Sequence, residues 1–414
     1  MNKKTLDIRP LLLLLLLNAL GIVVLIINKN EASHDIMVLS SIMCTVSIIA
    51  CVIIAKLKLG DPYLFIIVSM LSSVGIIMVS QLNSNAGKKQ LVWYIVGVAA
   101  FFAALWIYRV MNKRLKKLTL VYYMGAVLLF AATLIFGTRI HGAKNWLFGV
   151  QPSEFIRILY VMCLASAFFE PKSKGKKKLS KSAKWKKLLT SAFIAGTCAL
   201  FLLFQKELGT LLVFGVVYLV YLYVYGDSKP FLVLNILAVI GAAMFAVTVF
   251  SHVQERVVGW RDPLGTYENE GYQISLALMA VASGGFSGRG IGNGLPGNLY
   301  ALESDSIFVV ICEELGLMGG IAVLMLYFVL VYRGFKIALS TTNPFNKAVS
   351  VGLSVAIGIQ TFIIVGGITN LIPLTGITLP FISAGGSSMV STFMIVGILQ
   401  SISSMKGETS DELE

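Results

Sequence analysis

Long apolar runs, separated by short polar segments, cover most of the chain. A helix needs about 20 predominantly apolar residues to cross the hydrocarbon core of a bilayer. Twelve runs in this sequence are close to that length, and each predicts one membrane-spanning helix. The runs are 10–28, 36–55, 63–79, 91–108, 118–136, 152–169, 188–204, 208–225, 231–250, 307–332, 348–371 and 381–402. The pattern therefore predicts an all-α polytopic membrane protein.

Composition agrees with this fold class and excludes several others. Of the 414 residues, 57% are hydrophobic and only 13% are charged, whereas a soluble domain has about 45–50% apolar residues. A soluble enzyme, a nucleic-acid reader and a disordered tail protein are excluded on these grounds. The net charge of +14 does not indicate nucleic acid, because the location of the basic residues decides what they contact.

Lysine and arginine lie mainly in alternate loops, and this bias predicts the orientation in the membrane. With the N-terminus in the cytoplasm, 24 of the 34 basic residues fall on the cytoplasmic side. Both termini are then cytoplasmic, and segment 251–306 lies outside. Nine lysines between Lys172 and Lys187 are interpreted as a topology signal in a solvated loop, with binding of anionic lipid headgroups as the alternative.

The outer segment 251–306 is the longest connection between two predicted spans. Loops longer than about 12–15 residues are usually functional or disordered, and the aromatic residues of this one argue against disorder. The apolar stretch 274–282 is too short to cross the bilayer, so it predicts a re-entrant or interfacial helix. Glycines then dominate Gly284–Gly294. They are interpreted as backbone that approaches a ligand closely or adopts a positive φ, with a flexible turn as the alternative. No βαβ pattern surrounds them, which excludes a dinucleotide-binding loop.

Asp305 stands where this polar segment meets the next apolar run. A carboxylate at such a boundary is partly desolvated, and partial desolvation makes it a stronger base. The alternative is a helix N-cap, because an aspartate there accepts hydrogen bonds from free main-chain N–H groups. Position alone leaves both interpretations open.

Several charged residues lie inside or beside the apolar runs, where a charge is costly and usually faces a cavity or a partner. Glu154 and Arg157 are three residues apart and share a helix face. All of these residues fall in the outer half, which indicates an external site, although a structural ion-pair network would give the same pattern. The charged residues are Lys144, Glu154, Arg157, Lys206, Glu207, Glu313 and Glu314. The basic side chains that would suit an anionic headgroup such as a pyrophosphate are Lys144, Arg157, Arg256, Arg261 and Arg289.

Several segments, in order along the chain, resemble the motifs of one family. The first half of the chain contains Gly142–Trp146 with Gln151–Phe155, similar to GA-basic-x-W and QPSE, and Gln205–Thr210, similar to QPDLGT. The second half contains Arg256–Gln273, similar to R-x-x-x-W … GYQ, then Gly284–Gly294 with Asp305–Gly316, similar to GG-x-x-G-x-G-x-G … TDFIF … EELG, and Pro373–Ser388, similar to PLTGIPLPFISYGGSS. On these motifs the chain resembles the SEDS family (shape, elongation, division and sporulation), which contains RodA and FtsW.

This resemblance implies a peptidoglycan glycosyltransferase of the bacterial plasma membrane, with lipid II as its substrate. It implies a ten-helix core at 61–404, an additional N-terminal helix pair at 1–60 and a short cytoplasmic tail at 405–414. A class B penicillin-binding protein, which is a transpeptidase, and other elongation or division proteins are the expected partners. Roles in elongation, division and sporulation are not separated by the motifs.

The resemblance also assigns roles to individual residues. The essential aspartate of the family falls on Asp305, which is expected to act as the catalytic base. A divalent cation, Mg²⁺ or Mn²⁺, is a possible aid to the leaving pyrophosphate, and its ligands are unknown. The residues expected to bind substrate are Lys144, Trp146, Glu154, Arg157, Glu207, Arg256, Arg289, Ser304, Glu313, Ser387 and Ser388.

The chain departs from the family motifs in several positions. Lys206 and Glu207 replace the proline and aspartate of QPDLGT, and Ala384 replaces the tyrosine of FISYGGSS. The LPE-A-H-T segment before Asp305 reads Leu299–Ser304 here. These differences suggest a divergent paralogue. Two other functions remain open, namely a lipid II flippase or twelve-span transporter, and a non-catalytic scaffold for a cell-wall synthase.

Overall fold

The computed structural model describes residues 12–16, 18–20, 23, 33–140, 143–169, 181–294 and 303–405. Within this part of the chain, 11 helices are long and apolar enough to cross a membrane. The predicted all-α polytopic membrane fold is therefore confirmed. The first predicted span, 10–28, lies largely outside the described residues, and those of its residues that are described are helical.

The helices follow the apolar runs closely. Two of them, α6 (Pro152–Phe169) and α8 (Leu208–Tyr225), begin and end at the predicted residues. The other spanning helices are α2 (Ser33–Lys56), α3 (Pro62–Leu82), α4 (Ser84–Leu115), α5 (Thr119–Phe136), α7 (Lys181–Gln205), α9 (Lys229–Val249), α12 (Ile307–Ser340), α13 (Pro344–Ile368) and α14 (Gly386–Ser404).

The prediction for the last span began too early. Residues 381–385 are not helical, and α14 begins only at Gly386. Phe381 has a φ of 68°, which lies outside the right-handed helical region. The hydroxyl of Ser383 accepts the main-chain N–H of Leu379 at 2.8 Å, so this segment forms its own turn ahead of the helix.

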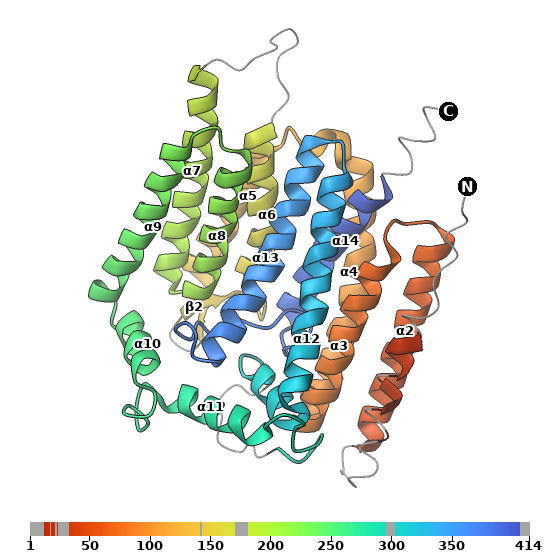
Figure 1. Cartoon of the computed structure of the whole chain (residues 1–414). Coiled ribbons are helices and arrows are strands. Elements are labelled where there is room, and N and C mark those ends of the chain that lie inside the picture. Colours follow the sequence, from red (N-terminus) through yellow and green to blue (C-terminus); the bar gives the residue numbers. More distant parts are fainter. Residues whose placement is uncertain are drawn as a thin grey trace. The chain divides into compact units, whose positions relative to one another are not determined.

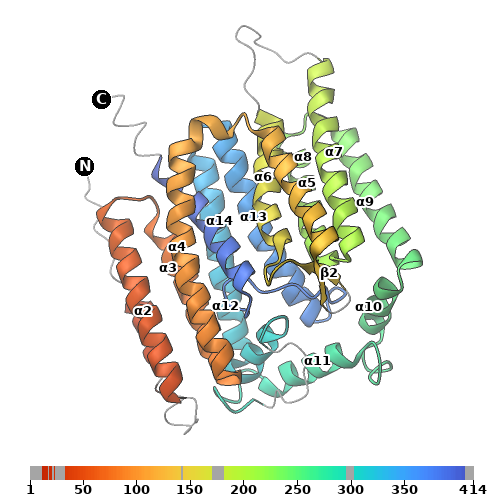
Figure 2. The same ribbon diagram turned by 180° about the vertical axis from the view of Figure 1, so that it is seen from behind.

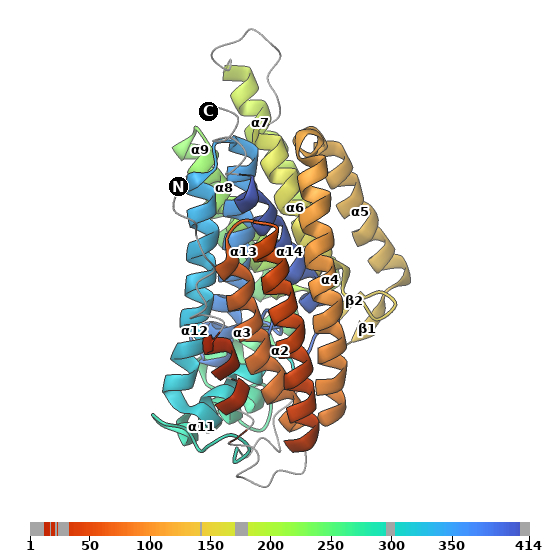
Figure 3. The same ribbon diagram turned by 90° about the vertical axis from the view of Figure 1, so that its right-hand side faces the viewer.

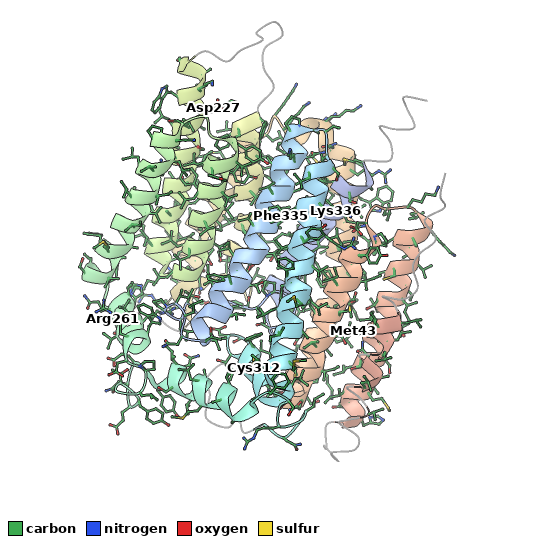
Figure 4. All side chains as sticks on the ribbon, viewed as in Figure 1. Met43, Asp227, Arg261, Cys312, Phe335 and Lys336 are labelled. Carbon is green, nitrogen blue, oxygen red and sulfur yellow. The ribbon has the colours of Figure 1, made fainter. Side chains whose placement is uncertain are left out.

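The long segment 251–306 contains two helices rather than one. The helix predicted at 274–282 is present as α11 (Tyr272–Gly284), and its re-entrant or interfacial position stays a prediction. A further helix, α10 (Ser251–Arg261), was not predicted, because its residues are mostly polar and form no apolar run. Figure 1 shows both helices, and Figure 4 marks Arg261 at the end of α10.

Residue contacts divide the chain into two compact units. The first unit is Met1–Leu105, Glu255–Arg333 and Thr361–Glu414, and the second is Trp106–Gln254 and Gly334–Gln360. In the first unit α2 lies along α3 (Figure 3). A polar contact ties α2 to α4, where the hydroxyls of Ser47 and Tyr94 are 2.7 Å apart. Asn18 Oδ1 accepts a hydrogen bond from Ser73 of α3 at 2.6 Å, so the N-terminal region is joined to the helices that follow it by buried polar groups.

In the second unit α5, α6, α7 and α8 pack against one another (Figure 2). The rings of Tyr160 and Phe214 stack at 4.4 Å between α6 and α8. After α5 the chain forms an antiparallel hairpin of β1 (Thr138–Ile140) and β2 (Ala143–Trp146). This hairpin contacts α5, α6 and α7, so it brings Lys144 and Trp146 to the end of the unit where α7 meets α8.

Helix α12 is broken at Gly316, where φ is 70° and ψ is −174°. The break leaves main-chain groups without partners inside the helix, and the glycine-rich segment supplies partners for them. The N–H groups of Arg289 and Gly290 donate to Glu313 O at 3.0 Å and Glu314 O at 2.9 Å. On the other side of the break, Leu317 N–H donates to Gly285 O at 3.0 Å.

Close main-chain approach explains why glycine is required in this segment. A Cβ on Gly284 would lie 2.2 Å from Cys312 O, and a Cβ on Gly288 would lie 2.2 Å from Glu314 O. Figure 4 marks Cys312 in the half of α12 near α11. The glycines therefore serve contact with α12 of the same chain. The predicted positive φ is confirmed at Gly285, Gly288, Gly290 and Gly292, and close approach of this segment to a ligand stays a prediction.

Candidate active site

Asp305 lies two residues before the start of α12 and is half-buried. Its carboxylate faces the loop between α13 and α14. A Cβ placed on Gly376 would lie 3.4 Å from Asp305 Oδ2 and 3.7 Å from Arg256 Nη2. Gly376 itself has a φ of 68°, a conformation that glycine adopts without strain. The carboxylate and the guanidinium therefore meet at one glycine, which leaves room for both.

Arg256 is held in this position by the main chain. Its Nη1 donates to Leu374 O at 2.7 Å, and one turn further along α10 the indole N–H of Trp260 donates to Asn370 O at 3.0 Å. Burial lowers the pKa of the Arg256 guanidinium, and the neighbouring carboxylates of Asp305 and Glu255 oppose that shift. An arginine stays protonated despite such a shift, so the site contains a fixed positive charge beside Asp305.

The predicted substrate residues of α14 lie close to the same loop. Ser387 and Ser388 are buried in the first turn of α14. The hydroxyl of Thr378 donates to Ser388 Oγ at 2.9 Å. The carbonyl of Ser304 accepts a hydrogen bond from Ser383 at 2.6 Å. The first unit thus brings Asp305, Ser304, Arg256 and the two α14 serines to one loop, and their roles in binding substrate stay predictions.

Arg289 and Glu313 were both predicted to bind substrate, and they pair with each other. Arg289 Nη1 lies 3.3 Å from Glu313 Oε1, and Ser283 Oγ donates to the same oxygen at 3.3 Å. Beside them, the buried carboxylate of Glu314 accepts a hydrogen bond from Gln81 of α3. These contacts fix the glycine-rich segment to α12, and α12 to α3. They are consistent with the structural ion-pair interpretation of this group.

The remaining predicted residues belong to the second unit. Glu154 and Arg157 form the ion pair that their spacing predicted, with Arg157 Nη2 and Glu154 Oε2 2.7 Å apart. Arg157 also donates to the amide oxygen of Gln360 in α13. Only 3% of Arg157 is exposed, so the pair is buried.

Glu207 lies in the short turn between α7 and α8, and only 6% of it is exposed. Gln151 Nε2 donates to Glu207 Oε1 at 3.2 Å. Burial raises the pKa of the Glu207 carboxyl, against the effect of hydrogen bonds from the polar side chains around it. Those side chains are Ser153, Gln151, Asn145 and Thr210. This carboxyl joins the QPSE-like segment to the α7–α8 turn.

Lys206, which stands where the family motif has proline, has a φ of 62°. Its N–H donates to Leu203 O at 3.1 Å, and Glu207 N–H donates to Leu202 O at 3.0 Å. This pair of bonds is the Schellman arrangement that ends a helix with a left-handed residue. Proline cannot occupy such a position, because its ring fixes φ near −65° and it has no N–H. The turn therefore differs in conformation from one that contains proline.

Lys144, which was predicted to bind substrate, contacts main-chain groups of its own unit. Its ammonium group donates to the main-chain oxygens of Leu134 and of Ile135, the latter at 3.3 Å. Positive charge at the C-terminal end of a helix is favourable, so this lysine stabilises the end of α5. Trp146 pairs with Thr138 in the hairpin. Binding of substrate by these two residues stays a prediction.

Several residues that hold the site together were not predicted from the sequence. Gln81 donates to Glu314, and Gln360 accepts from Arg157. Gln90 donates to Ile382 O, and Ser383 donates to Ser304 O. The three glutamines carry no charge and lie in or beside apolar runs. A polar amide within a membrane span is itself a signal of an interhelical contact, and it could have identified them.

Comparison with known proteins places the chain in a family. The model of the FtsW, RodA and SpoVE family, described as "Cell cycle protein", matches residues 50–408. The peptidoglycan glycosyltransferase RodA of Mycobacterium tuberculosis is 32% identical over 365 residues, which are 83% of this chain and 78% of that protein. Stage V sporulation protein E of Bacillus subtilis is 32% identical over 370 residues, which are 83% of this chain and 96% of that protein.

A solved structure shares the fold. It comes from work described as "Structural coordination of polymerization and crosslinking by a peptidoglycan synthase complex", and it matches with a TM-score of 0.69 and 24% identity. The match covers 84% of this chain and 98% of the solved chain. Ordered motifs, a family model that spans most of the sequence and two relatives above 30% identity agree, and the chain belongs to the FtsW, RodA and SpoVE family of cell cycle proteins.

Proposed function

We propose that this protein is a peptidoglycan glycosyltransferase that polymerises lipid II into glycan strands at the outer face of the plasma membrane. Its relatives carry the names peptidoglycan glycosyltransferase RodA and "Probable peptidoglycan glycosyltransferase FtsW", and family membership supports the same activity here. The observation that carries the proposal is the pairing of Asp305 with Arg256 beside Gly376. A half-buried carboxylate next to a fixed cation suits a reaction that moves a proton and releases an anion.

The proposed reaction is a single displacement. The 4-hydroxyl of the sugar of one lipid II attacks the anomeric carbon of the lipid-linked end of the growing strand. The new glycosidic bond forms as the bond to undecaprenyl pyrophosphate breaks, so an α-linked donor gives a β-linked product. Asp305 takes the proton of the attacking hydroxyl. Arg256 stabilises the negative charge of the departing pyrophosphate.

Arg256 suits this role better than a lysine would. A guanidinium presents several N–H donors in a fixed plane and binds phosphate oxygens in pairs. Its bond to Leu374 O uses one of those donors and leaves others for a ligand. The charge is thus already oriented before substrate arrives, which is the condition for electrostatic stabilisation of a transition state.

A divalent cation would add charge at the same pyrophosphate. Among the residues that the structure describes, no three His, Cys, Asp or Glu side chains come together to hold a metal ion. The charged neighbour of Asp305 is the guanidinium of Arg256, which would repel a cation. The described residues therefore do not fit a metal held by the protein alone.

The proposed location is the outer leaflet, with both termini in the cytoplasm. The distribution of lysine and arginine supports this orientation, since 24 of 34 lie in loops that would then be cytoplasmic. A class B penicillin-binding protein is the proposed partner. The similar solved chain belongs to a complex that couples polymerisation and crosslinking. We also propose that the N-terminal pair at 1–60 is an addition to the core, since the family match begins at residue 50.

One experiment separates this proposal from its rivals. The purified protein is placed in liposomes with lipid II, and both glycan strand formation and transfer of lipid II between leaflets are measured. The proposal predicts strands of many disaccharides. Transfer without polymerisation would identify a flippase or transporter, and neither activity in the presence of an active partner transpeptidase would identify a scaffold.

A further inference from the structure

The loop between α13 and α14 contacts both members of the Asp305–Arg256 pair. Leu374 O accepts from Arg256 at 2.7 Å, as described above. Further along the loop, Ala384 N–H donates to Glu303 O at 2.7 Å and Ser383 Oγ donates to Ser304 O at 2.6 Å. Two consecutive residues of the loop are therefore bonded to the two residues that immediately precede Asp305.

The contact with Ser304 O has a specific geometric consequence. This carbonyl belongs to the peptide bond whose nitrogen is that of Asp305. A peptide unit is planar, so Ser304 O, Asp305 N and Asp305 Cα lie in one plane. Fixing the oxygen therefore also restricts the position of the Asp305 Cα. The bond from Ser383 thus restricts the orientation of the residue that carries the carboxylate.

The hydroxyl of Ser383 is itself held at both ends. It accepts a hydrogen bond from Leu379 N–H at 2.8 Å and donates one to Ser304 O. The hydroxyl hydrogen is therefore oriented toward Ser304 O. Ser383 is only 4% exposed, and its neighbour Ile382 is fully buried. Water cannot readily replace either bond at such a site, so removal of the hydroxyl would leave two main-chain groups without partners.

Other helices of the first unit hold the loop in place. Gln90 of α4 donates to Ile382 O at 2.8 Å, and Tyr327 of α12 donates to Pro380 O. A Cβ on Gly75 of α3 would lie 2.6 Å from Ile382 O, so α3 and the loop are in direct main-chain contact. The loop is thus anchored to three helices. Its hydrogen bonds to residues 303 and 304 therefore restrict the movement of those residues as well.

We propose that Ser383 is a positioning residue of the reaction, which orients Asp305 by bonding the Ser304–Asp305 peptide to the anchored loop. This inference rests on the proposed function, because it takes Asp305 as the base. Ser383 does not contact the reacting atoms. The neighbouring departure from the family motif, Ala384, does not weaken the arrangement, since its contact with Glu303 O is made by the main chain.

The test compares variants of the full-length protein in liposomes with lipid II. Ser383→Ala should lower kcat on the order of 10–100-fold, because small misplacement of a catalytic group is costly. KM should change by less than about threefold, because the substrate contacts remain. Ser383→Thr, which keeps the hydroxyl, should recover most of the lost kcat. The matched control is Ser354→Ala, which removes another buried hydroxyl, one that donates to Ser350 O at 2.7 Å; its kcat should stay near wild type.

The outcomes separate positioning from folding and from the proposed function. If Ser383→Ala folds and keeps wild-type kcat, the positioning role is wrong. If it fails to fold, Gln90→Met decides, because it loosens the same loop from α4; a wild-type kcat in that variant also overturns the proposal. Asp305→Asn is measured in parallel. Absence of strand formation by the wild-type protein refutes the proposed function. Wild-type activity in Asp305→Asn refutes Asp305 as the base, whereas an inactive Asp305→Asn with fully active Ser383→Ala refutes the positioning role alone.

Discussion

The carboxylate of Asp305 and the guanidinium of Arg256 lie against the same glycine, Gly376. Three separate segments of the chain supply these residues, namely α10, the start of α12 and the loop before α14. If Asp305 served only as an N-cap of α12, neither α10 nor the loop before α14 would be needed for that role. The arrangement therefore favours a functional role for Asp305 over a purely structural one.

Replacement of Arg256 tests whether its charge serves the leaving group. Arg256→Met should lower kcat on the order of 10²–10³-fold, as expected when one stabilising donor is removed from a transition state. Arg256→Lys should recover only part of the loss, because an ammonium group lacks the planar pair of donors. Strand formation in liposomes measures both. The control is Arg261→Met, which removes an exposed arginine from the same helix and should retain activity; equal losses in the two helix variants would contradict the assignment.

The glycine-rich segment should tolerate no side chain where it touches α12. In Gly284→Ala the new Cβ would lie 2.2 Å from Cys312 O, and overpacking of this kind costs about 1–3 kcal/mol. The thermal unfolding midpoint should therefore fall. Gly196→Ala in α7 is the control, since a Cβ there meets nothing within 4 Å. An unchanged midpoint for Gly284→Ala would show that the close contact with α12 is not formed.

The α7–α8 turn should reject the proline that the family motif places there. Lys206→Pro requires a residue with φ near 62° to adopt about −65° and also removes an N–H donor, at a cost of about 3 kcal/mol or more. Lys206→Gly, which adopts a positive φ freely, should be as stable as wild type or slightly more so. Unfolding curves of the two variants provide the measurement, and a stable Lys206→Pro protein would mean that this turn is built differently.

Glu207 should make stability depend on pH. Burial raises its pKa above the ordinary 4.5, so the unfolded chain loses this proton at a lower pH than the folded one. The contribution of the carboxyl to stability is therefore greatest below pH 4.5 and declines as pH rises from there through the folded pKa. Glu207→Gln keeps an oxygen for Gln151 and should remove the decline. Unfolding midpoints measured from about pH 5 to pH 8 test this; parallel curves for the two proteins would contradict it.

The sequence predicts the spans well because apolar length is a local property. Both ends of α6 and α8 were predicted, where Pro152 begins one helix and Gly226 follows the other. The break in α12 could not be predicted in this way. Gly316 stands in an apolar run like many other glycines, and its conformation depends on the main chain of Gly285 and Gly288, which are distant in sequence.

The site was predictable in its chemistry and less so in its contacts. Asp305 was identified by its boundary position and by the motif, and the Glu154–Arg157 pair by its helical spacing. The spacing could not show that Lys144 bonds the end of α5 or that Arg289 pairs with Glu313. Only the folded structure brings these residues into contact, so their sequence spacing does not predict the contacts. Gln90 and Ser383 hold the loop beside Asp305. Both are neutral, so a prediction based on charged residues in apolar runs does not include them.

The most direct test of the account is the turnover of Asp305→Asn on lipid II in liposomes, with insertion and thermal unfolding measured on the same preparation. Asparagine keeps the shape and removes the basic oxygen, so strand formation should fall on the order of 10²–10⁴-fold, the usual contribution of a general base. The folded fraction and the unfolding midpoint should match wild type. A correctly inserted Asp305→Asn protein that polymerises lipid II at the wild-type rate would contradict the claim that this carboxylate takes the proton of the attacking sugar.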